Sequence, residues 1–486
     1  MPTDIPHAHT KNHAFIDLNA RVREGMALCN RRGMLKASLA GMAGLSLPQL
    51  LARRANAVAA GQSMSSRKSV ILLWLAGGPS HLDTWDPKPT RPFENRGPFG
   101  VTQTALPGVH FCEHLPKQAA MADKFTVIRS VDCRMSNHEP NMVMQTGNRE
   151  AGPRVNPQGH LYPAYGSIIS KFRGANEPGL PPYVAFQRSR SHVAYGGYLG
   201  QKHDPFLAQQ VTKLPIYDLV GNDTGQVGGA PLFTLASGLD SARIGSRREL
   251  LQQIDQIRSH LDNAGWMDAF DTYNQQAAEM VTGPRAREAF DIEREDPRIR
   301  ARYGKHLWSQ QTLIARRLVE AGVSFVTLDL SYHTSSGTWD NHGIPGGVYG
   351  GISKGLGPLL PLFDHLYTTL LTDLEERGLL DDVLVVAMGE FGRTPNIGTQ
   401  GSTDGRNHWP VVMSMLLAGG GLRHGQVIGA SESDGADIAL RPVTPADLAA
   451  TIYRHMDVPL DTTYLDSRGR PRYIIEEGGQ PLRELF

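Results

Sequence analysis

The sequence predicts an α/β fold in which helices cover both faces of a mostly parallel central sheet. Two segments, residues 69–76 and 383–388, are apolar almost throughout and lack the alternation of a half-exposed strand. Such runs are typical of strands buried on both faces of a parallel sheet. From 359 to 374 apolar residues recur at intervals of three, four and seven, which predicts a helix just before the second strand.

Length and composition favour one globular domain. The chain has 486 residues, of which 40% are hydrophobic and 20% charged, with a formal net charge of +1. A near-neutral chain without a dense Lys/Arg block gives no sign of a nucleic-acid partner. We expect one domain over 61–486, with a loop-rich insertion at 152–245 that covers the functional edge of the sheet. Cys112 and Cys133 are expected as buried thiols or one bridge.

The first predicted strand leads to a candidate functional loop. A glycine pair at 77–78 ends the strand at 69–76, and His81 and Asp83 follow. Ligands of open α/β sheets bind beyond the carboxyl ends of the strands, and glycines let the backbone approach a ligand closely. His81 and Asp83 are therefore candidate metal or substrate contacts.

The second predicted strand, at residues 125–131, leads to Ser136, Asn137 and His138 ahead of a helix that closes near residue 147. Ser136 or Asn137 is expected to cap this helix, whose positive N-terminal end would stabilise an anionic substrate. A plain capping role is the alternative for Ser136. His138 is equally a candidate metal ligand and a surface residue.

The middle of the chain predicts a third strand that ends at ligand-type residues. Amphipathic patterns predict helices at 248–274 and 310–321, and the second of these feeds a strand at 323–328. Asp340 and His342 follow that strand after a polar loop. An irregular loop has no fixed face, so both side chains can point at one ion.

The last third of the chain adds two more candidates. Gly378 is expected to end the helix that precedes the strand at 383–388, and Glu390 follows this strand directly. His408 comes next, and a Thr-Pro start predicts a helix that closes near residue 455.

Together these side chains have the chemistry of a metal site. Asp340, His342, Glu390 and His408 offer carboxylate and imidazole donors, which suit Zn or Mn, with Ca or Mg as alternatives. The structural alternative is that Asp340 and His342 form a hydrogen-bonded pair within the loop. Their place beyond strand ends favours a divalent metal.

The N-terminal 60 residues read as an export signal. Arg31 and Arg32 resemble the twin-arginine motif, and an apolar stretch at 37–51 and a small-residue cleavage site follow in the right order. The stretch is shorter than the ~20 residues that cross a bilayer. We expect a signal peptide at 1–60, recognition by the twin-arginine translocase, a periplasmic location and no membrane span after processing; a disordered basic tail is the alternative.

Five motifs carry a resemblance to a known family. They are GGPS at 77–80, WDNHG at 339–343, MGEFGRTP at 388–395, NHWP at 407–410 and RPVTP at 441–445. With these motifs the chain from about residue 69 onward resembles an uncharacterised exported family of unknown function within the alkaline phosphatase and sulfatase superfamily. The resemblance implies an alkaline phosphatase-like fold.

The resemblance also implies metal ligands. Asp340, His342 and His408 match the first metal of the superfamily. A second ion would be held by the remaining candidates, namely Glu390, His138, and His81 or Asp83.

The sequence departs from the superfamily at three places. A glycine pair at 77–78 stands where the first strand carries an Asp ligand, Asn137 stands at the nucleophile position, and Phe391 stands in place of a ligand His. If Ser136 does not attack, hydrolysis requires a water activated by the metal.

The combined expectation is a metal-dependent hydrolase of sulfate or phosphate esters, acting on a small-molecule or glycan anionic ester. Arg393 or Arg406 would clamp the anionic group, and Ser136 and Asn137 would line the reaction site. The alternative is a non-catalytic binding or scaffold protein on the same fold.

Overall fold

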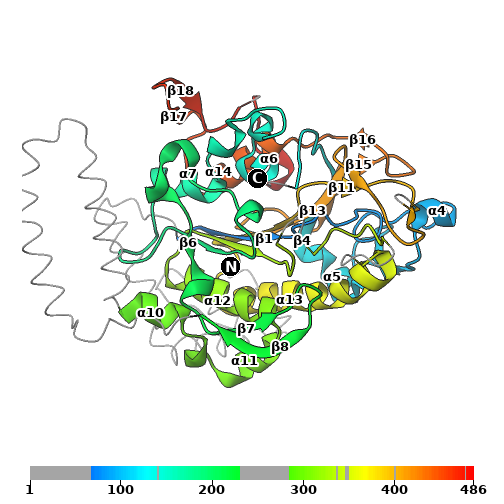
Figure 1. Cartoon of the computed structure of the whole chain (residues 1–486), viewed down its shortest axis with the longest axis horizontal. Coiled ribbons are helices and arrows are strands. Elements are labelled where there is room, and N and C mark those ends of the chain that lie inside the picture. Colours follow the sequence, from blue (N-terminus) through cyan, green and yellow to red (C-terminus); the bar gives the residue numbers. More distant parts are fainter. Residues whose placement is uncertain are drawn as a thin grey trace, which may run out of the picture. The chain divides into compact units, whose positions relative to one another are not determined.

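A computed structural model of the chain describes residues 67–138, 142–229, 284–334, 338–344, 350–398, 401–476 and 478–486 (Figure 1). The expected signal peptide at 1–60 and the helix expected at 248–274 lie outside the described residues. Ser66–Phe486 form one compact unit.

The unit is built on a central sheet of eight strands. In spatial order these are β14 (Gln426–Ile428), β4 (Phe125–Val131), β13 (Met413–Gly419), β10 (Val383–Met388), β1 (Ser69–Trp74), β9 (Phe325–Asp329), β5 (Tyr183–Phe186) and β6 (Phe206–Leu207). β13 runs against its neighbours β10 and β4, and the other pairs are parallel. The predicted α/β fold with a mostly parallel sheet is therefore confirmed.

Helices cover both faces of the sheet (Figure 1). One layer contains α6 (Met142–Thr146), α7 (Tyr165–Phe172) and α14 (Pro445–His455). The other contains α5 (Pro116–Ala120), α10 (Pro284–Phe290), α11 (Pro297–Tyr303), α12 (Leu307–Ala321) and α13 (Gly357–Glu376). The short α4 (Phe93–Arg96) lies toward one end of the molecule.

The central strand β1 shows why two layers are needed. Val70, Leu72 and Trp74 pack with α6, α7 and α14, whereas Ile71 and Leu73 pack with α12 and α13. Successive side chains of a strand point to opposite faces, so an apolar run without alternation has to be buried on both. Burial of each large apolar side chain contributes ~1.5–3 kcal/mol to folding.

The predicted helix boundaries are confirmed where the sequence carries a clear signal. Gly378 follows α13 with a φ of 69°, a left-handed conformation that favours glycine after a helix. At the start of α14, Thr444 and Asp447 form a reciprocal capping box, and Pro445 occupies the first turn.

Two expectations concern the chain between β4 and β9. The helix α6 is described from Met142, and residues 139–141 lie outside the described part of the chain, so the N-cap at Ser136 or Asn137 stays a prediction. Within the region 152–245, β5 and β6 pair into the central sheet, so this region supplies core strands as well as loops.

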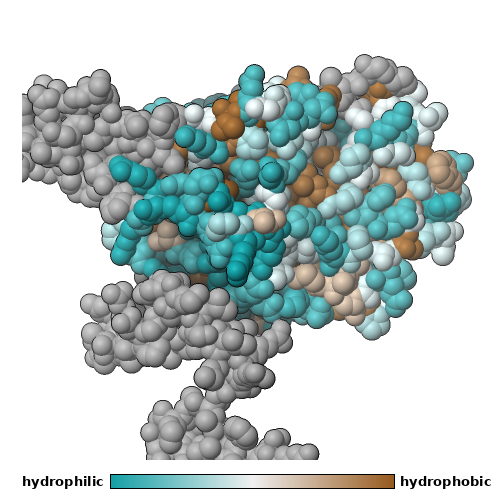
Figure 2. Space-filling model, turned by 90° about the horizontal axis from the view of Figure 1, so that it is seen from below, coloured by the Kyte–Doolittle hydropathy of each residue, from teal (hydrophilic) through white to brown (hydrophobic). Residues whose placement is uncertain are grey.

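In the described part of the chain, five two-stranded sheets lie outside the central sheet. They are β2 (Val101–Gln103) with β3 (His110–Cys112), β7 (Leu214–Tyr217) with β8 (Asp223–Gly228), β11 (Gly392–Arg393) with β12 (His408–Trp409), β15 (Ala430–Ser431) with β16 (Ile438–Leu440), and β17 (Thr463–Leu465) with β18 (Pro471–Tyr473). The face seen from below is mostly hydrophilic, with apolar residues in small separate groups (Figure 2).

Among the described residues no helix combines the length and apolarity needed to cross a membrane. Cys112 and Cys133 are buried free thiols.

Candidate metal centre

The topology gathers ligand-type side chains at one edge of the sheet. β4, β9 and β10 run in the same direction, so the residues that follow them emerge at the same edge. His138 comes after β4, Asp340 and His342 come after β9, and Glu390 comes directly after β10. β12 adds His408, which pairs with Arg393 across the small β11–β12 sheet.

Three histidine nitrogens and one carboxylate converge there. The Nε2 atom of His408 lies 2.7 Å from Nε2 of His138 and 2.8 Å from Nε2 of His342. The Asp340 carboxylate lies 2.9 Å from His342 Nε2, 3.4 Å from His408 Nε2 and 3.5 Å from His138 Nε2. We call these four residues the histidine cluster.

Within the histidine cluster, His138, Asp340 and His408 lie close enough together to hold one divalent ion, and His342 lies beside Asp340 and His408. A ring nitrogen carries either a proton or a lone pair, so His408 Nε2 cannot donate in one of its contacts and accept in the other. A cation among His138, Asp340 and His408 would satisfy these groups together. Ligand atoms around a tetrahedral zinc with ~2.0–2.1 Å bonds lie about 3.3 Å apart, close to the 2.7–3.5 Å found here.

The cluster is buried on three sides and open on the fourth. The side chains of Asp340, His342 and His138 are 4%, 8% and 9% exposed, whereas that of His408 is 37% exposed. The Phe391 ring contacts the rings of His138 and His408, with centroid distances of 4.7 and 4.9 Å. Phe391 therefore forms an apolar wall, and solvent reaches the cluster beside His408.

Glu390 supports the cluster from behind. Its side chain is fully buried, and Oε1 lies 2.7 Å from Nδ1 of His138. The backbone N–H of Gly77 donates to the same oxygen at 2.8 Å. The sheet edge thus joins the loops after β1, β4 and β10.

Arg393 supports Asp340 in a similar way. Its guanidinium lies 2.6 Å from the Asp340 carboxylate and also donates to the carbonyls of Gly77, Gly78 and Arg406. Burial alone would raise the Asp340 pKa, but Arg393 and the three cluster histidines hold it well below its usual range. Asp340 is therefore a permanent negative charge.

The cluster attracts positive charge. Burial alone would lower the His138 pKa, but hydrogen bonds to Asp340 and Glu390 raise it to about 9. Burial lowers the His408 pKa to about 4, and the charges of Arg393 and His138 act in the same direction. The carboxylates of Asp340 and Glu390 therefore favour a positive charge beside the His138 ring.

His81, Asp83 and Arg406 are engaged elsewhere. The ring of His81 lies 2.9 Å from the carbonyl of Gly435 through Nε2. Asp83 accepts from Arg406 at 2.6 Å in a pair whose side chains are both fully buried, and from Ser80 at 2.5 Å. Arg406 also donates to backbone carbonyls, including that of Asn95 at 2.7 Å. These contacts hold the loop after β1 against the chain before β12.

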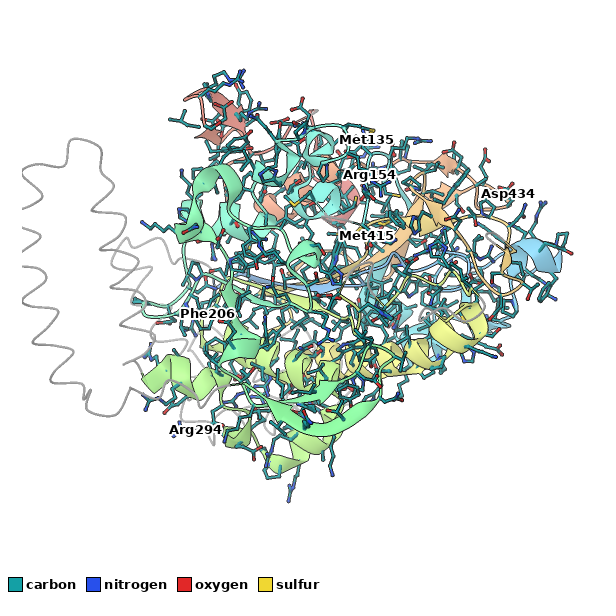
Figure 3. All side chains as sticks on the ribbon, in the orientation of Figure 1. Met135, Arg154, Phe206, Arg294, Met415 and Asp434 are labelled. Carbon is teal, nitrogen blue, oxygen red and sulfur yellow. The ribbon has the colours of Figure 1, made fainter. Side chains whose placement is uncertain are left out.

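Ser136 and Asn137 lie on the approach to His138. Ser136 is 8% exposed, and its Oγ is buried with no hydrogen-bond partner in the described part of the chain. Asn137 Oδ1 accepts from the backbone N–H of His138 at 2.8 Å. Met135, just before them, has a φ of 73° and lies on the α6 side of the sheet (Figure 3).

Sequence reasoning missed two features of this site. Arg393, which was expected to clamp the anionic group, contacts the Asp340 carboxylate, and Glu390 contacts the Nδ1 atom of His138. Both follow from burial at a strand end, where a charged side chain needs a partner. The apolar run before Glu390 carried that signal, because it predicted a fully buried strand.

Comparisons with known proteins place the chain as follows. Residues 67–486 match a family described as "Protein of unknown function (DUF1501)". No curated protein matches the chain. Matching solved structures include the PsFucS1 sulfatase from Pseudoalteromonas sp., at 11% identity over 85% of this chain and 72% of that one, with a TM-score of 0.34. Another is the phosphonate monoester hydrolase SpPMH from Silicibacter pomeroyi, at 12% identity over 86% and 76%, with a TM-score of 0.32.

Proposed function

Since the chain belongs to the DUF1501 family, whose description names no activity, we propose from its site that it binds one divalent metal ion and hydrolyses an anionic ester. The observation that carries this proposal is the convergence of three histidine Nε2 atoms on the Asp340 carboxylate. Three imidazoles with one carboxylate favour Zn or Mn over Ca or Mg, which prefer oxygen ligands.

The residues of the chain have distinct tasks in this proposal. Asp340 supplies the fixed charge that holds the ion, and Arg393 keeps that carboxylate ionised and oriented. His408 borders the open side, where a ligand would enter. A bound divalent ion would supply Lewis-acid chemistry and lower the pKa of a coordinated water to about 7.

Sulfate and phosphate esters are the proposed substrate class, from small molecules or glycans. The family resemblance and the negative charge that such esters would bring to a cation support this class. Ser136 Oγ is a candidate for contact with the substrate, because it is buried without a partner in the described part of the chain two residues before His138.

A non-catalytic binding protein is the second candidate function. The observation that favours it is that Arg393 and Arg406, the expected clamps of the anionic group, already donate to protein carboxylates and carbonyls. Phe391 and Asn137 also stand where the superfamily has a ligand and a nucleophile. In that reading the metal would stabilise a surface that recognises a partner.

Elemental analysis paired with an ester assay separates the two candidates. We expect about one divalent ion per purified chain, turnover of nitrophenyl phosphate or sulfate, and loss of both in Asp340→Ala. His365→Ala is the matched control, since His365 lies on α13 and contacts Lys117 and Tyr303. Metal without turnover of any ester would favour the binding protein, and metal-free protein would contradict both.

The location follows from the leader rather than from the site. We propose twin-arginine export to the periplasm, supported by Arg31 and Arg32 and the apolar stretch after them. Cell fractionation of the wild type and of a variant with both arginines changed to Lys tests this. Wild-type protein in the cytoplasmic fraction would contradict it.

A further inference from the structure

The deepest carboxylate at the site has contacts that differ from those of a metal ligand. Glu390 is fully buried at the end of β10, and its Oε1 receives the Gly77 N–H at 2.8 Å and lies 2.7 Å from His138 Nδ1. Within the described residues it makes no ion pair with His342 or His408. The group of side chains close enough to share an ion comprises His138, Asp340 and His408.

From these contacts we infer that Glu390 is a positioning residue, which fixes the tautomer and orientation of His138 so that Nε2 faces the ion. The inference rests on the proposed metal site and goes beyond it, because it assigns Glu390 a role outside the ligand set.

The tautomer follows from the donor and acceptor types. An ionised carboxylate only accepts hydrogen bonds, so the 2.7 Å contact with Oε1 makes His138 Nδ1 the donor. A neutral ring that is protonated on Nδ1 has its lone pair on Nε2. That atom lies 2.7 Å from His408 Nε2 and 3.5 Å from Asp340, inside the histidine cluster. Glu390 thereby aims the lone pair of His138 at the ion.

The glutamate is itself held in place. Gly77 has a φ of 119°, and a Cβ there would lie 2.3 Å from the backbone nitrogen of Asp340. Only glycine fits this position, which brings the Gly77 N–H against Glu390 and the Gly77 carbonyl against Arg393. The loop after β1 therefore fixes the supports of His138 and Asp340 together.

The second carboxylate oxygen of Glu390 allows an alternative role for this residue. Oε2 of Glu390 is buried and has no hydrogen-bond partner in the described part of the chain. If this oxygen bound the ion directly, Glu390 would be a ligand. The two roles differ in what the loss of His138 does: a positioning residue acts through that ring, whereas a ligand acts independently of it.

A double-mutant cycle on zinc affinity tests the inference. Zn²⁺ dissociation constants are measured by competition with a chelator for the wild type, Glu390→Gln, His138→Ala and the double variant. Loss of an orienting partner costs about 10- to 100-fold in metal affinity, and we expect that loss for Glu390→Gln in the wild-type background. In the His138→Ala background we expect the same change to alter the affinity by less than about twofold.

Two further variants keep the test independent of folding. Glu390→Asp retains the charge one methylene shorter, so we expect an affinity between those of the wild type and Glu390→Gln. Asp364→Asn is the matched control, because Asp364 is a buried carboxylate that accepts from the backbone of Lys117 and Gln118. Its zinc affinity should equal that of the wild type.

The outcomes separate this inference from the proposed function. Unchanged affinity in Glu390→Gln, beside a wild type that binds zinc, would overturn the positioning role alone. A further loss of tenfold or more in the His138→Ala background would make Glu390 a direct ligand and also overturn it. A wild type that binds no zinc would overturn the inference and the proposed function together.

Discussion

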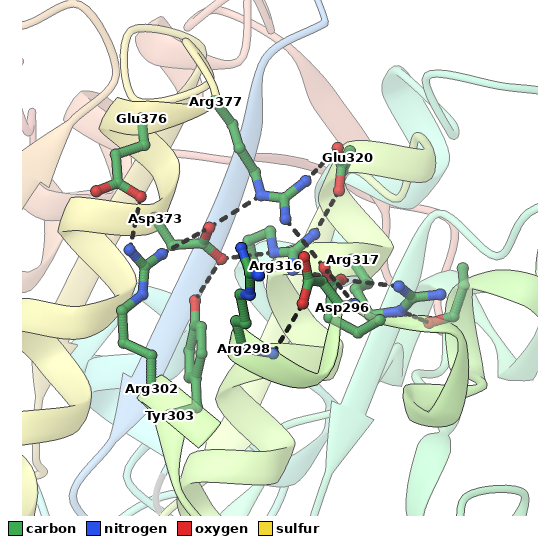
Figure 4. Close-up of polar contacts among 12 residues, drawn as sticks. Asp296, Arg298, Arg302, Tyr303, Arg316, Arg317, Glu320, Asp373, Glu376 and Arg377 are labelled. Carbon is green, nitrogen blue, oxygen red and sulfur yellow. Dashed lines mark hydrogen bonds and ion pairs between the residues drawn. The ribbon is translucent and has the colours of Figure 1, made fainter. Parts of the chain in front are cut away.

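Two groups of ionisable side chains, each built around buried carboxylates, satisfy those carboxylates in different ways. One is the histidine cluster, and the other, here the helix ion-pair cluster, lies among α11, α12, α13 and the segment before α11 (Figure 4). Its arginines are Arg302, Arg316, Arg317 and Arg377, and its carboxylates are Glu295, Glu320, Asp373 and Glu376.

The helix ion-pair cluster is complete by itself. Arg316 is fully buried and pairs with Glu295 at 2.5 Å, Glu320 at 2.5 Å and Asp373 at 2.8 Å. Four arginines face four carboxylates, and no charge is left over among the residues named. Such a network is structural, because every member already has its partner.

The histidine cluster lacks this balance. Nitrogens of its histidine rings face one another at 2.7 and 2.8 Å. The comparison shows that burial of charge does not by itself indicate function. What distinguishes this candidate site is a set of like groups that face one another, as the ring nitrogens do here.

The largest effect on stability is expected at Arg316. Removal of one partner from a buried network leaves uncompensated charge and costs about 3–5 kcal/mol. We expect Arg316→Met to lower the free energy of unfolding in urea by that amount, with unchanged metal content. Arg298→Met is the control, since Arg298 is exposed and should change stability by less than ~0.5 kcal/mol. Loss of metal in Arg316→Met would contradict the separation of the two clusters.

A smaller effect is expected from metal itself. A ligand that binds only the folded state stabilises it by about 2.7 kcal/mol at one hundred times its dissociation constant. We therefore expect Zn²⁺ to raise the melting temperature of wild-type protein stripped with a chelator, and to leave Asp340→Asn unchanged. An equal rise in both proteins would place the bound metal outside the histidine cluster.

The next smaller effect on stability is expected from acid, which acts on the helix ion-pair cluster. Burial alone would raise the Glu295 pKa, but Arg316, Arg317 and Arg377 lower it to about 2 from the ordinary 4.5. A carboxylate with a depressed folded-state pKa stabilises the fold above its unfolded-state pKa, and this contribution disappears as the pH falls through the folded-state value.

Glu295→Gln, which does not titrate, measures this contribution. We expect the difference in unfolding free energy from the wild type to be constant down to about pH 5 and to shrink between pH 4.5 and about 2. Urea titrations of both proteins at several pH values provide the measurement. A difference that does not vary with pH would show that Glu295 gains nothing from its arginines.

The smallest effect is expected at the molecular surface. Lys124 and Glu375 form an ion pair at 2.6 Å, but their side chains are 37% and 46% exposed. Exposed pairs contribute ~0–1 kcal/mol and are screened by salt. Lys124→Ala should thus lower stability by less than about 1 kcal/mol, and the loss should vanish at ~1 M salt. A loss comparable to that of Arg316→Met would remove the contrast between buried and exposed charge.

The sequence predicted most of the scaffold for physical reasons that remain visible in the structure. The apolar runs of β1 and β10 require cover on both faces, and they have it. The periodic pattern of α13 and its stop at Gly378 depend on local geometry that one segment encodes. The antiparallel direction of β13 was not predicted, because the apolar pattern of a buried strand does not depend on the direction in which the strand runs.

The site was predicted in residue type and place more than in detail. Strand ends indicated which side chains share an edge, and His138, Asp340, His342 and His408 lie together there. The pairing of Asp83 with Arg406 could not be predicted from the sequence, since these residues are 323 positions apart. Long-range pairing of charges depends on the assembled fold, which no local pattern encodes.

The most direct test of the central claim is a crystal structure of zinc-loaded protein with anomalous data at the zinc edge. One strong anomalous peak is expected ~2.0–2.2 Å from the Nε2 atoms of His138 and His408 and from an Asp340 oxygen, with His342 beside it. Glu390 should remain bonded to His138 Nδ1. A peak elsewhere, or none at full zinc occupancy in solution, would contradict it.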